Sequence, residues 1–163
     1  MVYCRAGDAD RAIQILRPLV PGYRGGRFRM CEVFTAFLGE AYWRAGQPSL
    51  ATETLQELLE VIEPCGMRGW MGLAHRVLGE ISSTDGPAVA PQHFERSLAL
   101  LTETNAQPEL ALTCASYGRF LRRQGHMEEA REYLERALEI SARLGTLTEP
   151  DRLRHELAEL HMK

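Results

Sequence analysis

Apolar residues recur at helical spacing along most of the chain, and the clearest stretch runs from residue 114 to residue 142. Its first half has one apolar side, formed by Tyr117, Phe120 and Leu121 around Gly118. Its second half follows the i, i+3, i+4, i+7 spacing of an amphipathic helix, with Ala130, Tyr133, Leu134, Ala137 and Leu138. The polar residues 124–126 separate the two halves. The pattern therefore predicts two helices joined by a short turn, which is a helical hairpin.

The same arrangement recurs along the chain with a nearly constant period. Ala12, Ala51, Ala90 and Ala130 are 39, 39 and 40 residues apart, and Gly39, Gly79 and Gly118 are 40 and 39 residues apart. A fixed period of this size is typical of a solenoid of stacked helical hairpins. The small residues are expected where two helices approach closely. We therefore predict an all-α fold of stacked antiparallel helix hairpins.

Breaks between the apolar runs divide this single predicted domain, residues 1–163, into hairpins. Full hairpins are expected at residues 28–63, 68–104 and 108–144, followed by a capping helix at 150–161. Residues 1–20 supply only the second helix of an earlier hairpin. Because the end of a solenoid needs a capping face, we expect either a truncated chain or further repeats before Met1. The unpaired helix should then expose Ile13 and Leu16 and promote self-association.

The expected core follows the apolar face of each helix. In the first full hairpin it comprises Phe34, Leu38, Tyr42, Ala51, Leu55, Leu58 and Leu59. In the second it comprises Leu73, Val77, Leu78, Ile81, Phe94, Leu98 and Leu101. In the capping helix it comprises Leu153, Leu157 and Leu160.

Composition and charge exclude several classes of function. The net charge of −3 gives no electrostatic reason to bind nucleic acid. The four cysteines lie far apart in the sequence, so neither a zinc ribbon nor a redox pair is predicted, and we expect reduced thiols in a cytoplasmic protein. No apolar run reaches the roughly 20 residues of a membrane span. We therefore expect neither nucleic acid nor a membrane as a partner.

No stretch of the sequence predicts catalysis, a cofactor or a metal. The segment 155–159 is similar to a zinc-protease helix, but Glu159 stands where the second histidine ligand is required. The glycine-rich segment 21–26 lacks the strand and the Lys-Ser/Thr ending of a phosphate-binding loop, so a connector is the better interpretation. A small helical enzyme remains the competing class, and it would require an inward cluster of histidines and carboxylates.

The predicted functional surface is the concave side of the stack, lined by the first helices of successive hairpins. Its positions are counted from the periodic glycine of each hairpin, at six and three residues before it and one and four residues after it. They are Val33, Ala36, Glu40 and Trp43, then Leu73, Arg76, Glu80 and Ser83, then Leu112, Ala115, Arg119 and Arg122. This stripe is either a peptide-binding groove or part of a purely structural array. For Trp43, packing on the neighbouring hairpin is favoured.

Most of the chain, from Met1 to Leu144, resembles an array of tetratricopeptide repeats. The best matches are Leu38-Gly39-x-x-Tyr42 with Ala51, and Tyr117-Gly118-x-x-Leu121 with Ala130, Leu134 and Ala137. The sequence departs from the family at Thr35 and Cys114, where an aromatic residue is frequent, and at Ser97, where alanine is usual. The resemblance implies a right-handed superhelix that binds a protein or peptide segment.

Part of the sequence also resembles the C-terminal repeats of large bacterial signalling proteins. The segments 68–81, 93–98 and 128–134 are similar to the tails of proteins that combine a class III adenylate or guanylate cyclase with an AAA-type ATPase, and to those of LuxR-type ATP-dependent regulators. This resemblance implies a regulatory scaffold whose partner is an upstream domain of the same parent protein. A sensor or oligomerisation region, or a structural dimerisation tail, is the alternative.

The arginines of the stripe predict the chemistry of the partner. Arg119 and Arg122 lie three residues apart on one helix face, and Arg76 occupies the matching face one hairpin earlier. Because arginine pairs with carboxylates in a bidentate manner, we expect an acidic, partly apolar segment to bind there. Glu40 and Glu80 oppose this preference.

Overall fold

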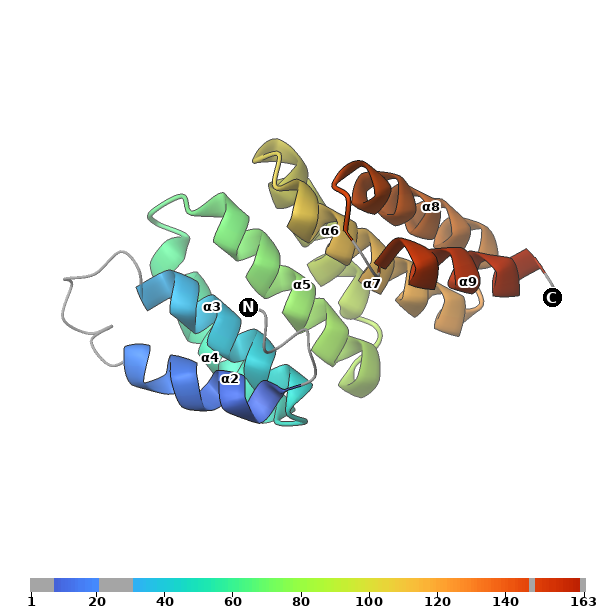
Figure 1. Ribbon diagram of the computed structural model, residues 1–163. Coiled ribbons are helices and arrows are strands. Elements are labelled where there is room, and N and C mark those ends of the chain that lie inside the picture. The colour runs from blue at the N-terminus through green and yellow to red at the C-terminus, as the bar shows by residue number, and fades with distance from the viewer. Residues whose placement is uncertain (1–7, 21–30, 147–148, 162–163) are drawn as a thin grey trace.

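The computed structural model describes residues 8–20, 31–146 and 149–161, which form helices and no strand (Figure 1). The helices are α2 (Ala9–Leu16), the 3₁₀ helix η1 (Arg17–Leu19), α3 (Cys31–Arg44), α4 (Pro48–Ile62), α5 (Arg68–Asp85), α6 (Ala90–Glu103), α7 (Gln107–Gln124), α8 (Met127–Arg143) and α9 (Glu149–His161). The pairs α3/α4, α5/α6 and α7/α8 pack as hairpins and stack in chain order. The predicted all-α solenoid is confirmed.

The turns that close the hairpins follow from local sequence. Gly125 ends α7 with a left-handed φ of 88°, a conformation that glycine adopts without a steric penalty. Its N–H and that of His126 bond back to carbonyls of the last turn of α7. Pro48, Pro91 and Pro108 lie at the starts of α4, α6 and α7, where the missing N–H of proline costs no helical hydrogen bond.

The core lies between the helices of each hairpin and between successive hairpins. Most of the expected core residues are buried, and Phe94, Leu55 and Leu134 are fully so. Phe34, Tyr42, Leu59, Tyr133, Leu138 and Leu160 are half-buried and pack at the edges of the same clusters. Phe94 stacks on Tyr117 of the next hairpin, so the aromatic core continues across the boundary between hairpins.

The periodic glycines lie where the two helices of a hairpin touch. A Cβ atom on Gly39 would lie 2.5 Å from Cδ2 of Leu55, and one on Gly79 would lie 3.0 Å from the ring of Phe94. On Gly118 it would lie 2.9 Å from Cγ of Leu134 and 3.0 Å from the carbonyl oxygen of Ala130. These distances explain the repeated glycine, because a larger side chain has no room there.

We expect Gly118→Leu to lower the free energy of unfolding by about 1–3 kcal/mol, because the added side chain overpacks the contact between α7 and α8. Gly69→Leu is the matched control, since no atom lies within 4 Å of a Cβ built there. Both variants replace a helical glycine with a better helix former, so the difference between them reports overpacking. Urea denaturation measures both. Equal stabilities for the two variants would refute the close contact at Gly118.

Helix α2 packs the side that carries Ile13 and Leu16 against the following hairpin. Its Leu16 is buried with Leu38 and Ala41 of α3, and Ile13 is half-buried beside them. The expectation that Ile13 and Leu16 are exposed is therefore wrong, because the second helix of one hairpin covers the first helix of the next. The α-helix also ends at Leu16, before Pro18, and residues 17–19 continue as a 3₁₀ turn. The glycine-rich segment 21–26 and residues 28–30 lie outside the described residues.

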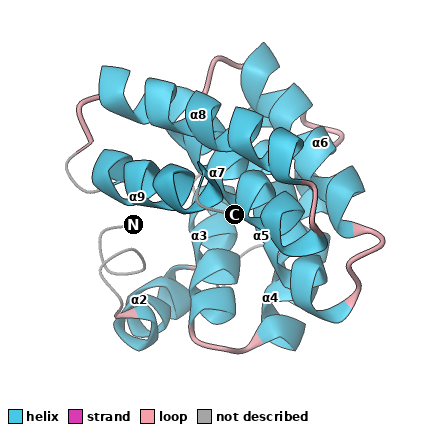
Figure 2. Ribbon diagram, turned by 90° about the vertical axis from the view of Figure 1, so that its right-hand side faces the viewer, coloured by secondary structure: helices cyan, strands magenta, loops and turns pink. Residues whose placement is uncertain are grey.

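Helix α9 continues the stack beyond the third hairpin (Figure 2). Leu153 and Leu157 are buried in the core cluster of α7 and α8. The opposite side of α9 carries exposed polar residues, among them Asp151, Arg154 and His155. A helix with this distribution covers the apolar end of the α7/α8 hairpin and places a polar face in solvent.

A candidate protein-interaction groove

The first helices of the hairpins, α3, α5 and α7, follow one another along one side of the stack and continue into α9 (Figure 1). A hollow of about 610 Å³ lies along these helices. Its walls combine apolar side chains such as Leu112 and Leu144 with arginines and glutamates. A concave surface of this kind is where a solenoid of hairpins presents its binding face.

Arg76 forms the centre of a buried charge cluster beneath the groove. Its side chain is fully buried, with Nη1 2.9 Å from Oε1 of Glu80 and Nη2 3.2 Å from Oε1 of Glu40. Glu109 of α7 lies 3.6 Å from the same Nη2. Burial acts to lower the pKa of Arg76, but the three carboxylates outweigh it and hold the pKa above its ordinary value. The cluster joins α3, α5 and α7, one helix from each hairpin.

Glu80 extends this cluster to the wall of the groove. The indole Nε1 of Trp43 donates to Oε2 of Glu80 at 3.0 Å, and the hydroxyl of Ser116 donates to Oε1 at 2.6 Å. Trp43 therefore packs on the neighbouring hairpin. A carboxylate that accepts from an indole, a hydroxyl and a guanidinium is held in one position, so this wall of the groove is preformed.

A second charge network attaches α9 to α7. Nε of Arg119 lies 2.8 Å from Oε2 of Glu156, and its Nη2 lies 3.0 Å from Oε1 of Glu149. Burial acts to lower the pKa of Arg119, and the hydrogen bonds to Glu156 and Glu149 raise it above its ordinary value. Arg122 pairs with Glu159 at 3.2 Å. These arginines position the helix that closes one end of the groove.

The structure corrects the predicted stripe at five positions. Ala36, Glu40, Leu73, Arg76 and Ala115 are buried and do not offer a free side chain to a partner. The reason is that successive hairpins stack closely enough to cover these positions, which the spacing within one helix does not show. Val33 is half-buried, and Arg122 lies beside the groove in its ion pair with Glu159. Trp43, Glu80, Ser83, Leu112 and Arg119 remain along the groove.

Sequence reasoning missed several groove residues. Arg44 and Arg123 lie one residue beyond predicted stripe positions, and Ser116 lies one residue after Ala115. Glu149 and Arg152 come from α9, for which the sequence pattern predicted only a capping role. Extending the periodic stripe into residues 150–161 would have found Arg152, because α9 occupies the place of a first helix.

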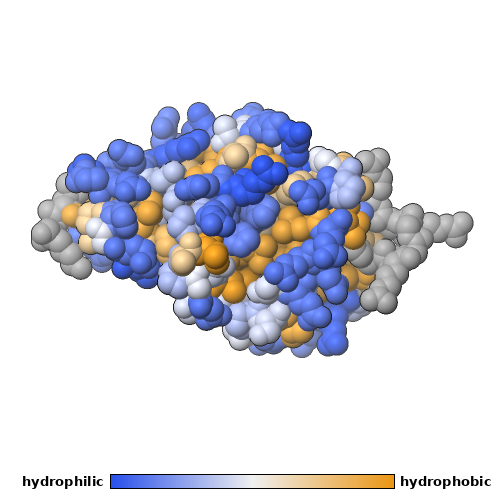
Figure 3. Space-filling view, turned by 180° about the vertical axis from the view of Figure 1, so that it is seen from behind, coloured by the Kyte–Doolittle hydropathy of each residue, from blue (hydrophilic) through white to orange (hydrophobic). Residues whose placement is uncertain are grey.

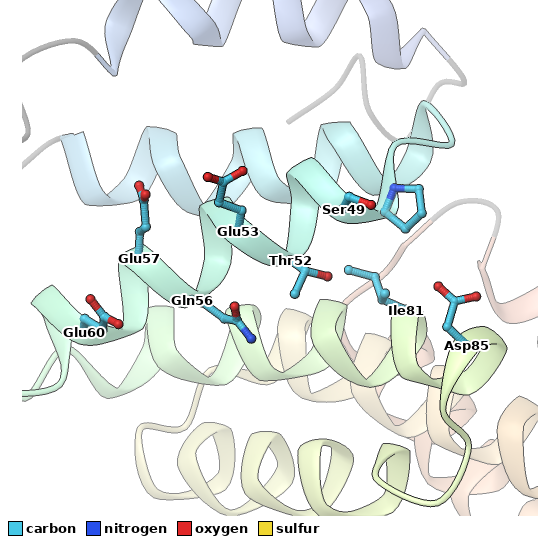
Figure 4. Close-up of a pocket in the computed structure, with 9 residues that line it drawn as sticks. Ser49, Thr52, Glu53, Gln56, Glu57, Glu60, Ile81 and Asp85 are labelled. Carbon is cyan, nitrogen blue, oxygen red and sulfur yellow. The ribbon is translucent and has the colours of Figure 1, made fainter.

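Arginine outnumbers glutamate along the wall of the groove, but Arg44, Arg119 and Arg152 are each paired with a glutamate of the wall or just beneath it. Its lining, among the described residues, contains Arg44, Arg119, Arg123 and Arg152 above the buried Arg76, but only Glu80 and Glu149 as acidic residues. A second hollow of about 470 Å³ lies between α4 and the end of α5 and has the opposite character (Figure 4). There Glu53, Glu57, Glu60 and Asp85 form an acidic rim.

The described ranges 8–20, 31–146 and 149–161 lack a membrane-spanning helix and a cluster of metal-binding side chains. No helix there has the length and hydropathy needed to cross a bilayer. In the same ranges, no group of three or more histidine, cysteine, aspartate or glutamate side chains is arranged to hold a metal ion.

Comparisons with known proteins agree with this geometry. Residues 111–143, which cover most of α7 and α8, match the sequence profile described as "Tetratricopeptide repeat". A crystal structure of TPR-like repeats from a putative kinesin light chain of Podosopora anserina has a TM-score of 0.66 and 21% identity, covering 98% of this chain and 81% of the other. A single-substitution variant of that protein gives a TM-score of 0.67 at 21% identity, with 98% and 80% covered. The comparison with curated proteins gives no match. The chain thus contains a tetratricopeptide repeat within a TPR-like fold.

Proposed function

We propose that this chain is a protein-interaction scaffold whose concave groove receives an acidic, partly apolar segment of a partner protein. The observation that carries the proposal is the pair of exposed guanidiniums, Arg123 and Arg152, beside the apolar Leu112 and Leu144 along a groove with a preformed wall. The lack of a recognisable catalytic constellation in the sequence favours a binding role over a small helical enzyme.

The groove offers separate contacts for charge and for apolar surface. Arg123 is exposed and has no ion-pair partner among the described residues, and Arg152 is 63% exposed although it pairs with Glu156. These guanidiniums can pair with carboxylates of a ligand in a bidentate manner. Leu112 is half-buried and Leu144 is exposed, and both line the same hollow. An extended segment with alternating acidic and aliphatic side chains fits this arrangement.

We further propose that the scaffold works in the cytoplasm as part of a larger bacterial signalling protein, with upstream domains of that protein as its partner. This proposal rests on the sequence resemblance of segments 68–81, 93–98 and 128–134 to the tails of cyclase–ATPase fusion proteins. A sensor or oligomerisation region of a LuxR-type regulator is the alternative context.

We propose self-association through exposed apolar residues of the N-terminal segment as a second candidate function. Ile15 and Leu19 at the N-terminal end of the stack are 46% and 45% exposed. Apart from these two residues, the face behind that of Figure 1 also has apolar surface interrupted by hydrophilic residues (Figure 3). We propose weak association through α2, which light scattering over a range of concentrations can test against an Ile15→Ser variant.

Charge reversal in the groove tests the main proposal. A fluorescent peptide of alternating glutamate and leucine should bind the wild type, and Arg123→Glu should weaken its binding by about tenfold, or ~1.4 kcal/mol. The loss should shrink as salt rises, because exposed charges are screened beyond about 8 Å at physiological ionic strength. Arg119 is a less specific probe, because its replacement would also break the ion pair with Glu156 that holds α9 against α7. Fluorescence anisotropy gives the affinities.

The matched control is Arg136→Glu, which makes the same charge change beside the outer faces of α6 and α8. It should leave peptide binding unchanged. A peptide with lysine in place of glutamate should bind the wild type poorly. Equal losses for Arg123→Glu and Arg136→Glu would show that only net charge matters and would exclude the groove as the binding site.

A further inference from the structure

Two histidines face each other across the second hairpin, away from the charge clusters of the groove. Nδ1 of His75 on α5 lies 3.1 Å from Nδ1 of His93 on α6. The ring centroids are 5.4 Å apart, and the ring planes differ by 33°. The centroids are therefore farther apart than the nitrogens, so the Nδ1 edges point toward each other. Both side chains are half-buried, which leaves the pair accessible to a small ion.

Burial favours the neutral form of both imidazoles. Burial lowers the pKa of His75 to about 4, with contributions from the nearby His93 and Arg96. Burial also lowers the pKa of His93. In the free protein one Nδ1–H donates to the other Nδ1, because two lone pairs at this distance would repel each other. Moving that proton to Nε2 of the same ring frees both Nδ1 lone pairs without a net loss of a proton.

We propose that His75 and His93 form a chelating site for a divalent transition-metal cation such as Ni²⁺, Cu²⁺ or Zn²⁺. Imidazole nitrogen is a preferred ligand of these ions and binds Zn²⁺ at about 2.0–2.1 Å. With the nitrogens held 3.1 Å apart, such bond lengths correspond to an N–metal–N angle of about 98°. This angle lies between those of square-planar and tetrahedral coordination. The metal then lies about 40° off the line between the two nitrogens, so both rings rotate to aim their lone pairs at it.

The surrounding residues determine which ions the site binds and with what affinity. The described residues offer no third histidine, cysteine or carboxylate arranged to join the pair, so water completes the coordination. Mg²⁺ and Ca²⁺ require oxygen ligands and are excluded. Arg96 places a positive charge near the pair and opposes a bound cation. The site is thus selective by ligand type, and its affinity is limited by the open coordination and by Arg96.

A metal bound there links α5 to α6 and stabilises the folded chain, because the two ligands come together only in the hairpin. The wild type should therefore show a Ni²⁺-dependent rise in melting temperature and a saturable isotherm in calorimetric titration with Ni²⁺ alone. His75→Asn and His93→Asn keep a polar group at each position and should each weaken Ni²⁺ binding tenfold or more, since even changes to residues that only support a ligand cost about 10–100-fold. Circular dichroism verifies that the variants fold.

Two matched variants separate this site from general metal binding to histidine. His126→Asn removes an exposed histidine in the turn between α7 and α8 and should leave the Ni²⁺ affinity unchanged. Arg96→Gln removes the opposing charge and should tighten binding severalfold. Mg²⁺ should produce no shift of the melting temperature. The proposal is overturned if His75→Asn binds Ni²⁺ as the wild type does, or if His126→Asn causes the same loss.

Discussion

Replacing Arg76 with methionine is expected to lower the free energy of unfolding by about 3–5 kcal/mol, the usual cost of removing one partner from a buried ion pair. Methionine has a comparable length and fills much of the same space, so lost packing contributes little. The cost arises because Glu40 is nearly fully buried and would lose its closest cation, while Glu80 and Glu109 would lose the guanidinium that pairs with them. Arg44, 3.4 Å from Glu40, compensates only partly.

Arg44→Met is the matched control, because it removes a guanidinium from the same carboxylate at a position where the side chain is 42% exposed. Its cost should be about 1 kcal/mol or less. Combining Arg76→Met with Glu40→Gln should restore part of the stability, since the buried charge is then removed with its partner. Urea denaturation of the wild type, the two single variants and the double variant, fitted with one common m-value, gives the free energies of unfolding. If Arg76→Met costs no more than Arg44→Met, the buried cluster does not hold the three hairpins together.

Replacing Phe94 with alanine is expected to cost about 3–5 kcal/mol, the range for deleting a buried aromatic ring. The Phe94 ring is fully buried and stacks on Tyr117 at a centroid distance of 5.1 Å. It also packs against Gly79, where an added Cβ atom would lie only 3.0 Å from the ring. It therefore belongs at once to the interior of the second hairpin and to its junction with the third. Its removal leaves a cavity that the rigid helices around it cannot fill by small shifts.

Phe94→Leu should cost clearly less than Phe94→Ala, because most of the cavity stays filled. Thermal unfolding followed by circular dichroism measures both variants. A single cooperative transition at lower temperature is expected, since the junction is shared by two hairpins. Stability of Phe94→Ala close to that of the wild type would contradict the continuous aromatic core.

Periodicity in the sequence predicted the hairpins, their glycine contacts and nearly all of the core. These features depend on the spacing of residues within one or two helices, for example Gly118 against Leu134. The sequence predicts less well which residues of the stripe on the first helices are exposed to solvent. Whether Arg76 faces solvent or a neighbouring hairpin depends on how two hairpins stack, and the spacing within one helix does not determine that.

The helix at each end of the described stack shows the same limit. The sequence pattern predicts Leu16 in solvent, yet α3 covers it. The sequence pattern predicts only that α9 closes the core, whereas Arg152 on its other side lines the groove. In both cases the decisive contact is between successive hairpins, as in the pairs Arg119–Glu156 and Trp43–Glu80, which are each 37 residues apart.

The most direct test of the proposed function is to locate a bound segment on the surface. A glutamate–leucine peptide carrying a photoreactive diazirine group can be cross-linked to the wild type, and the labelled residues identified by mass spectrometry. We expect labels on α5, α7 and α9, close to Leu112, Arg123 and Arg152, and their loss in Arg123→Glu. Labels confined to the outer faces of α4, α6 and α8, unaffected by Arg123→Glu, would contradict the proposed groove.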